Sequence, residues 1–310
     1  NIVYKKYCNT HFTTSQFHLF WNKILFKKLT SFSIWNFFGS LANIGATQGI
    51  NIILNIFWGV TVNAAAGIAN QLANAVNQFV TNFQTAFNPQ LVKLYASGNK
   101  EAFIQFIFQS SKFSYYLLFI IALPVMINSE FLLGIWLGNI PQYTADFCKW
   151  ILIFMLIDAI SSSLWMSVQA TGNIRNYQIL VSLFISMNIP IAYILSYLGF
   201  PPISVWIGKA IINFIVYIFR IFYLKRVFGL PTWKYIYQVL SICTLITLLS
   251  IPLPLYIQTI FSGWTGLILT TLCSIVVTVS IILLLGLNKV EKQIAFQAVN
   301  KFIHKITPHS

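Results

Sequence analysis

The sequence contains very few acidic residues and few charged residues of either sign. Only 5 of its 310 residues are Asp or Glu and 19 are Lys or Arg, so charged residues make up 8% of the chain, against about 25% in a typical soluble domain. Hydrophobic residues make up 57%, and the mean hydropathy is +0.75. So few charges cannot cover the water-exposed surface of a protein of this size. The composition therefore predicts an integral membrane protein.

The signatures of several functional classes are also missing. The four cysteines stand singly without a CxxC pair, and the four histidines lie near the ends of the chain without the spacing of metal ligands. No GxxxxGK[ST] phosphate loop is present, which argues against an ATP-driven pump. No Ser-His-Asp or paired-carboxylate pattern is visible. The sequence therefore predicts no enzyme, no metal site and no cofactor. We interpret the net charge of +14 by its position along the chain rather than as a sign of a nucleic-acid partner.

Long apolar segments follow one another along the chain. A spanning helix needs roughly 20 mainly apolar residues, and proline inside such a helix predicts a kink. Pro124, Pro190, Pro252 and Pro254 lie inside these segments. The sequence predicts an all-α fold, a polytopic transmembrane helix bundle of about eight spanning helices. The predicted segments are 31–57, 61–86, 113–128, 146–170, 176–199, 203–225, 236–258 and 263–287.

The positions of the Lys and Arg residues predict how the helices are oriented, because cytoplasmic loops carry an excess of them. Nearly all of them fall before the first predicted helix, after the second, fourth and sixth, or in the tail. This set includes Lys112 in the loop after the second helix and Arg220 at the end of the sixth. The opposite loops carry Glu130, Asp146 and Lys149. Both ends of the chain are therefore predicted to be cytoplasmic.

Uncharged polar side chains follow one face of each of the first two predicted helices. An unpaired amide facing hydrocarbon costs a few kcal/mol, so these faces must contact water or other helices. One interpretation is that the side-chain amides form hydrogen bonds between packed helices, which are worth about 0.6 kcal/mol each. A stripe along the whole helix favours the other, a water-filled cavity for a hydroxyl-rich ligand. The predicted pathway residues are Asn36, Asn43, Asn51, Asn63, Asn70, Asn74, Asn77 and Gln78.

Two ionisable residues lie well inside predicted helices, Asp158 in the fourth and Lys209 in the sixth. A charge at the membrane centre costs about 2.5–3.5 kcal/mol on insertion scales, so it needs water, a partner or neutralisation. Asp158 is either a proton or substrate group in a cavity, or a structural partner of Lys209 or of backbone donors. For Lys209 the alternatives are the same pairing, a cavity role, or a side chain that reaches outward to the interface.

Three stretches resemble a known family of membrane transporters. They are NPQLVKLYASGNKE at 88–101, SKFSYYLLFIIALPVMINSEFLLGIWLGNIPQYTADF at 111–147 and ATGNIRNYQ at 170–178. In them the chain resembles bacterial polysaccharide-unit flippases, which transport the repeat units of O-antigen and capsule. These belong to the superfamily that also holds the MATE multidrug exporters and the lipid II flippases. The similarity runs from about Ser31 to Leu230 and is weaker in the last two helices.

The resemblance implies a fold of two pseudosymmetric six-helix lobes around a central cavity, often followed by two further helices. The chain would be the C-terminal portion, with a first lobe expected before Asn1. Residues 1–30 would be a basic cytoplasmic segment between the lobes, 31–230 the second lobe, and 231–287 the additional helix pair. Residues 288–310 would be a basic cytoplasmic tail, either an amphipathic helix on the inner leaflet or a solvated chain.

The resemblance also implies a function in the bacterial inner membrane. Such a transporter flips an undecaprenyl-pyrophosphate-linked oligosaccharide from the cytoplasmic to the outer leaflet by alternating access. Its partners would be the lipid bilayer, the lipid-linked oligosaccharide and the N-terminal lobe. A cation-coupled multidrug or lipid II exporter of the same superfamily is an alternative. A non-transporting membrane scaffold is a second alternative.

Overall fold

The computed structural model describes residue 7, residues 21–288 and residues 291–293. Every regular element in these ranges is a helix. Most of the predicted segments 1–30 and 288–310 lies outside the described residues, so the predicted amphipathic tail is not described.

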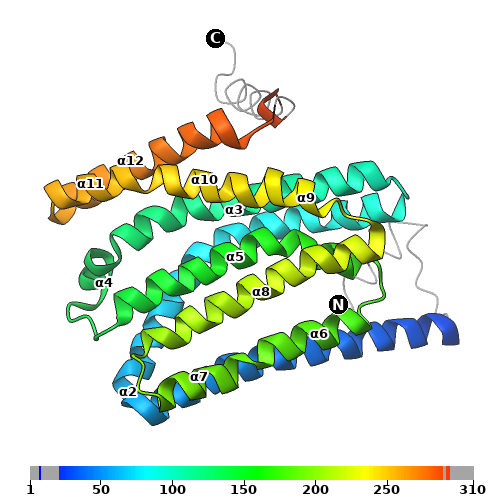
Figure 1. Cartoon of the computed structure of the whole chain (residues 1–310), viewed down its shortest axis with the longest axis horizontal. Coiled ribbons are helices and arrows are strands. Elements are labelled where there is room, and N and C mark those ends of the chain that lie inside the picture. The colour runs from blue at the N-terminus through cyan, green and yellow to red at the C-terminus, as the bar shows by residue number, and fades with distance from the viewer. Residues whose placement is uncertain (1–6, 8–20, 289–290, 294–310) are drawn as a thin grey trace.

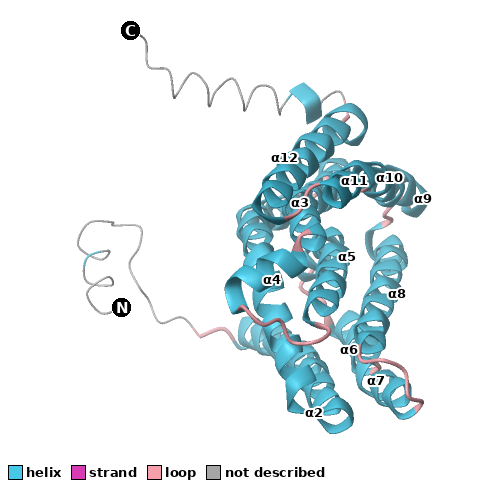
Figure 2. Cartoon of the chain, turned by 90° about the vertical axis from the view of Figure 1, so that its left-hand side faces the viewer, coloured by secondary structure: helices cyan, strands magenta, loops and turns pink. Residues whose placement is uncertain are grey.

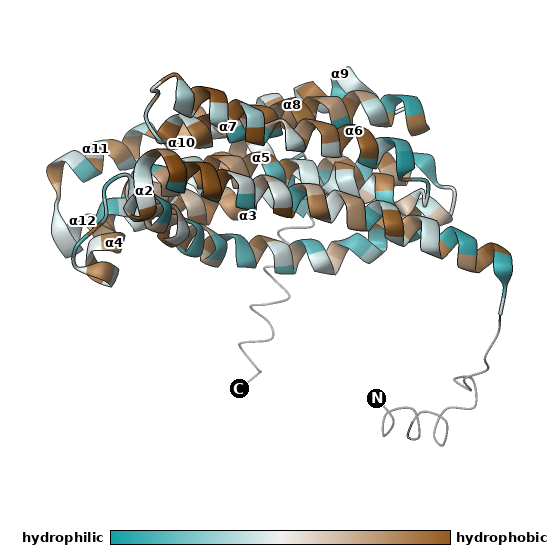
Figure 3. Ribbon diagram, turned by 90° about the horizontal axis from the view of Figure 1, so that it is seen from below, coloured by the Kyte–Doolittle hydropathy of each residue, from teal (hydrophilic) through white to brown (hydrophobic). Residues whose placement is uncertain are grey.

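Seven helices of the described part are long and apolar enough to cross a membrane. Figure 3 shows hydrophobic residues along the length of the helices that it labels. In its described part the chain is therefore all-helical, with the character of a multi-pass membrane protein. The seven helices are Lys23–Ala96, Lys100–Ile127, Thr144–Ala170, Arg175–Tyr197, Ile203–Phe228, Thr232–Ile260 and Gly263–Gly286.

The first of these, α2 (Lys23–Ala96), contains both of the first two predicted helices. Its regular geometry is interrupted at Gly59, where φ is 82° and ψ is 178°, a backbone conformation that is essentially restricted to glycine. Figure 1 shows the chain reversing direction at this bend, so that the two arms, residues 23–58 and 60–96, both extend from it toward the same end of the molecule. The predicted number of eight spanning helices is not confirmed, because a single glycine rather than a loop joins the first two segments.

The next elements along the chain are helices α3 to α8. Asn99 begins α3, since its side chain accepts a hydrogen bond from the Ala102 N–H at 3.1 Å. The predicted kink near Pro190 is present as a break between α6 and α7, because proline cannot donate the bond to the carbonyl four residues earlier. The elements are α3 (Lys100–Ile127), α4 (Ser129–Leu137), α5 (Thr144–Ala170), α6 (Arg175–Ser186), α7 (Asn188–Tyr197) and α8 (Ile203–Phe228).

The last elements form two further helical spans with local irregularities. The predicted kink at Pro252 is a break between α10 and α11, for the same reason as at α7. Each span also contains one π-helical stretch. The elements are α9 (Thr232–Tyr235), the π-helix η2 (Ile236–Leu240), α10 (Ser241–Ser250), α11 (Pro252–Ile260), α12 (Gly263–Ile281) and the π-helix η3 (Ile282–Gly286).

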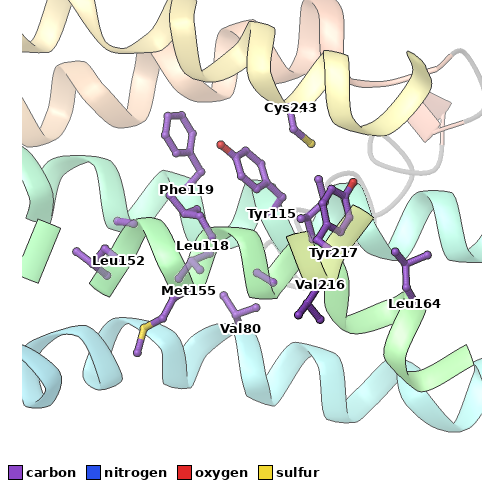
Figure 4. Packing of buried hydrophobic residues seen from close by; sticks show 14 of the residues in the cluster. Val80, Tyr115, Leu118, Phe119, Leu152, Met155, Leu164, Val216, Tyr217 and Cys243 are labelled. Atoms are coloured by element: carbon purple, nitrogen blue, oxygen red, sulfur yellow. The ribbon is translucent and has the colours of Figure 1, made fainter. Parts of the chain in front are cut away.

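The centre of the fold is α5, which packs against α2, α3 and α8. Figure 4 shows apolar side chains from these helices meeting in one core, among them Val80 of α2, Phe119 of α3, Leu152 of α5 and Val216 of α8. Figure 2 shows α10, α11 and α12 outside this group, beside α3, and all three pack on α3. The division into a six-helix lobe and an additional pair stays a prediction.

Successive helices bring most basic loops to one end of the bundle, which we call the basic end. The connections after α2, α5 and α8 lie there, at the right of Figure 1, whereas the Gly59 bend and the loops after α4, α7 and α11 lie at the other end. Lys112 and Arg220 are exceptions to the predicted distribution. Both are buried within helices α3 and α8 rather than in loops, so they contribute no charge to the loop surface.

Candidate functional site

A polar cavity of about 470 Å³ lies between α2, α5, α6, α7 and α8. The two arms of α2 border it together with the inner faces of the other four helices. Its wall contains three charged residues, described below, and several apolar ones. The amide and hydroxyl side chains of the wall are Asn36, Ser40, Asn43, Thr47, Gln84, Asn88, Ser162, Gln178, Asn188 and Asn213.

The first arm of α2 contributes its predicted polar stripe to this cavity only in part. Asn36 and Asn43 line the cavity, together with Ser40 and Thr47. Asn51 lies beyond it and donates a hydrogen bond to the Gln48 side chain at 3.3 Å. The cavity therefore reaches from the basic end to about the middle of this arm.

The second arm contributes different residues from those predicted. The predicted residues Asn63, Asn70, Asn74, Asn77 and Gln78 are not among the lining residues. Their place is taken by Gln84 and Asn88, which lie on the same arm nearer the basic end. The assignment of the five to a transport pathway stays a prediction.

The reason is the face on which the second arm packs. Its buried face contains four alanines, which let helices approach closely, followed by larger residues from Val76 to Leu91, while Phe79 on another face is 61% exposed. The amide face therefore lies beside the buried face: Asn74 and Gln78 are exposed, and Asn63 and Asn77 are half-buried. Asn70 is half-buried and donates to the Ala66 carbonyl of its own helix at 2.8 Å. The alanines of the buried face are Ala65, Ala66, Ala69 and Ala73.

Asp158 and Arg220 form an ion pair in the cavity wall. Arg220 Nη1 lies 3.9 Å from Asp158 Oδ1, with the two side chains 9% and 57% exposed respectively. The same Nη1 donates to Ser161 Oγ at 2.5 Å. Sequence reasoning missed Arg220 as a site residue, because its closeness to the end of α8 suggested an interfacial position. The available signal was that about two turns of helix still separate it from Phe228.

Lys209 also lines the cavity but contacts aromatic rings instead of an acid. Its Nζ lies 4.6 Å from the centroid of the Phe154 ring and 5.0 Å from that of Trp206. Such cation–π contacts stabilise an ammonium in a poorly hydrated place. Of the predicted alternatives for Asp158, pairing with Lys209 is thus not what the structure shows; Arg220 takes that role. The cavity wall holds two cations and one acid.

Some cavity amides are also bonded across helices. Asn36 and Gln169 exchange two hydrogen bonds, at 3.4 and 2.9 Å, and join the first arm of α2 to the end of α5. Gln84 donates to Ser162 Oγ at 2.8 Å. Hydrogen bonds between packed helices are therefore present at part of the polar stripes, while a water-filled cavity for a hydroxyl-rich ligand stays a prediction.

The cavity wall keeps polar atoms without a partner. Within the described part, Gln178 Oε1 and Arg220 Nε are buried and make no hydrogen bond, an arrangement that is uncommon in folded proteins. Gly39 makes room for the Gln178 amide: a Cβ at position 39 would lie 1.3 Å from its Nε2. These groups suit a ligand that both donates and accepts hydrogen bonds.

No protein-family model, curated protein or solved structure matches this chain. The described residues contain no group of three His, Cys, Asp or Glu side chains that could hold a metal ion. The chemistry available in the cavity is therefore hydrogen bonding by amides and hydroxyls, together with the charges of Asp158, Lys209 and Arg220.

Proposed function

We propose that this chain is part of a flippase in the bacterial inner membrane. It would move an undecaprenyl-pyrophosphate-linked oligosaccharide from the cytoplasmic to the outer leaflet, for the synthesis of cell-surface polysaccharide or lipopolysaccharide. The observation that carries the proposal is a polar cavity of about 470 Å³ inside a bundle of apolar helices. Polar cavities inside multi-pass proteins mark the paths by which polar substrates cross the bilayer.

The cavity chemistry supports a sugar as the cargo. Side-chain amides donate and accept hydrogen bonds without charge, as the hydroxyl groups of a sugar require. Asn43 and Ser40 line the cavity and are exposed, while Gln178 Oε1 is buried in its wall without a partner. An oligosaccharide that passes between these groups forms hydrogen bonds to them in place of those that it made to water.

The cavity charges support an anionic lipid carrier. Lys209 and Arg220 outnumber Asp158 in the wall, and Arg220 Nε has no protein partner among the described residues. A positive cavity attracts the pyrophosphate group and disfavours a cationic drug. The same charges are compatible with a lipid II exporter, because lipid II also carries a pyrophosphate.

The exposed amide face of the second α2 arm belongs to the same proposal. Gln71, Asn74, Gln78 and Asn82 are exposed on this arm. Gln78 donates to Asn82 Oδ1 at 3.2 Å, but hydrocarbon would leave the other amide atoms unsatisfied. In the proposed transporter this face borders the water-filled path or the N-terminal lobe that the family resemblance implies.

Deletion and complementation in the source organism test this function. Deleting the gene is expected to abolish the surface polysaccharide and to cause lipid-linked repeat units to accumulate on the inner face of the membrane. The full-length protein should restore both, and variants Lys209→Gln and Arg220→Gln should restore them less well than the surface variant Lys225→Gln. Normal polysaccharide in the deletion strain would overturn the proposal.

A further inference from the structure

A second polar cavity, of about 530 Å³, lies at the basic end between α3 and the last helical spans. Its wall on the α3 side is one stripe of that helix, and its other walls come from the start of the α9–η2 span and from the residues after η3. The cavity shares no lining residue with the first one. It is therefore separate from the proposed transport path.

A buried ion pair forms one side of this cavity. Lys112 Nζ lies 2.8 Å from Glu291 Oε2, and each side chain is 3% exposed. The same carboxylate oxygen accepts the Asn288 N–H at 2.8 Å, and Lys112 also donates to the Gly286 carbonyl. The two buried charges thus neutralise each other and have further hydrogen bonds, as buried pairs require.

The other two charges of the cavity are exposed and have no ionic partner. Glu101 stands at the start of α3 and Lys234 in α9, and neither forms an ion pair within the described residues. Between them the wall offers the side-chain amides of Gln105, Gln109 and Gln238. The free groups are therefore one anion, one cation and several amides, with no net charge.

One π-helical stretch of the described chain borders this cavity, and the other ends two residues before the lining residue Asn288. Gln238 belongs to η2, and η3 ends at Gly286, whose carbonyl accepts hydrogen bonds from Lys112 and from Tyr116 Oη at 3.1 Å. π-Helical turns occur frequently at functional sites. Here they lie at the junction where both last spans meet α3.

We propose that this cavity binds the headgroup of a zwitterionic phospholipid with a primary ammonium, of the phosphatidylethanolamine type. The cavity opens among helix ends at the basic end, the depth at which lipid headgroups lie. Lys234 would bind the phosphate, while Glu101 and the amide oxygens would accept hydrogen bonds from the ammonium. The lipid would hold the last two spans against α3.

Other headgroups fit this cavity less well. A phosphatidylcholine headgroup has no N–H to donate, and quaternary ammonium groups are bound mainly by aromatic cages. In the described wall the only aromatic lining residue is Phe108. A phosphatidylglycerol headgroup carries the phosphate but leaves Glu101 without a cation. The cavity therefore selects for the ammonium as well as for the phosphate.

Native mass spectrometry of the purified chain tests this site. The detergent-solubilised chain is titrated separately with phosphatidylethanolamine, phosphatidylcholine and phosphatidylglycerol of identical acyl chains, and with free phosphoethanolamine. Phosphatidylethanolamine is expected to bind about three- to sevenfold more tightly than the other two lipids, since one charge-assisted bond in a partly exposed site is worth about one to two times RT. Equal retention of the three lipids would overturn the proposal, as would saturation by free phosphoethanolamine at the concentration where the lipid binds.

Two exposed substitutions locate the binding site, and neither disturbs the buried pair. Glu101→Gln is expected to remove the preference for phosphatidylethanolamine over phosphatidylcholine, and Lys234→Gln to weaken the binding of all three lipids. Glu130→Gln, exposed at the opposite end, and Lys225→Gln, exposed at the end of α8, are the matched controls. If the controls change lipid binding as much as the test variants do, the ammonium and phosphate are bound elsewhere and the proposal is wrong.

Discussion

Single polar residues make the cavity wettable, and neighbouring positions on one helix differ in this respect. Asn43 lines the cavity, whereas Ile44 is 59% exposed but is not part of the cavity wall. Both are accessible in the isolated chain, but only one of them is next to a polar path. This contrast separates cavity water from general exposure.

Cysteine labelling measures the contrast directly. In a background without the four native cysteines, Asn43→Cys should react several-fold faster than Ile44→Cys with a water-soluble maleimide in membranes, because a thiolate forms readily only where water reaches it. The rate is followed by the mass shift of the protein. Equal rates at the two positions would show that the cavity is dry in the membrane.

Gly39 is a residue whose size matters for the cavity. Its α-carbon faces the Gln178 amide so closely that any added Cβ displaces that amide. Gly39→Ala is expected to destabilise the protein by about 1–3 kcal/mol, as overpacking does, measured as a shift in the midpoint of SDS-induced unfolding. The double variant Gly39→Ala with Gln178→Ala should recover part of this loss.

Gly45 provides the control on the same arm. A Cβ there meets no atom within 4 Å, so Gly45→Ala should be neutral or stabilise by up to about 1 kcal/mol through helix propensity. A loss at position 45 as large as that at position 39 would mean that the cost comes from the backbone and not from Gln178.

At the scale of helices, the bend at Gly59 decides how α2 is used. Its φ of 82° with ψ of 178° lies in a region that side chains with a Cβ avoid, and no neighbouring atom lies within 4 Å of a Cβ built there. Gly59→Ala should therefore cost about 1–3 kcal/mol through backbone strain alone. Gly67 is the control, because it is helical and a Cβ there also meets no atom within 4 Å. If Gly59→Ala and Gly67→Ala unfold at the same SDS concentration, the bend does not depend on glycine.

The attachment of the last spans to α3 depends on the Lys112–Glu291 pair. Lys112→Ala leaves the buried Glu291 carboxylate with the Asn288 N–H but without a cation, which should cost about 3–5 kcal/mol in unfolding free energy. The pair of Lys149 and Asp146 is a natural comparison, because its 3.6 Å contact is exposed. Lys149→Ala should cost less than about 1 kcal/mol. Similar losses in the two variants would contradict the burial of the first pair.

At the scale of the whole molecule, the basic end should face the cytoplasm. Lys225→Cys at this end should react with a membrane-impermeant thiol reagent only after the inner membrane is permeabilised, whereas Glu130→Cys at the opposite end should react in cells whose inner membrane is intact. Both positions are exposed, so accessibility across the membrane is the only variable. The opposite pattern would invert the proposed orientation and the direction of transport.

Much of the fold was predictable because it follows from local composition. The apolar segments 146–170 and 203–225 lie within α5 and α8, since a chain in hydrocarbon must satisfy its backbone hydrogen bonds within each segment. Breaks near Pro190 and Pro252 were predictable from the missing N–H, whereas Pro124 and Pro254, which also predicted kinks, lie inside α3 and α11 without interrupting them. The joining of the first two helices at Gly59 was not, because only the observed backbone angles distinguish a glycine bend from a loop.

The site was predictable only in part, because it depends on which faces pack. Asn36 and Asn43 were identified from helical spacing, as were Asp158 and Lys209 from their charge within apolar segments. Arg220 was missed because closeness to a helix end is a one-dimensional criterion, and its partner Asp158 is 62 residues away in sequence but 3.9 Å away in space.

By itself the sequence determined that this protein is helical and has the character of a multi-pass membrane protein, because composition and the period of apolar residues fix those properties segment by segment. Only the tertiary structure decided which polar side chains meet. On the second arm of α2, alanines such as Ala69 and Ala73 pack against the core and the larger Phe79 does not. Close approach of helices favours small residues, so Asn74 and Gln78 of that arm are exposed, while Gln84 and Asn88 line the cavity. The same packing encloses Arg220 and Lys112, whose charges the sequence had assigned to the membrane surface.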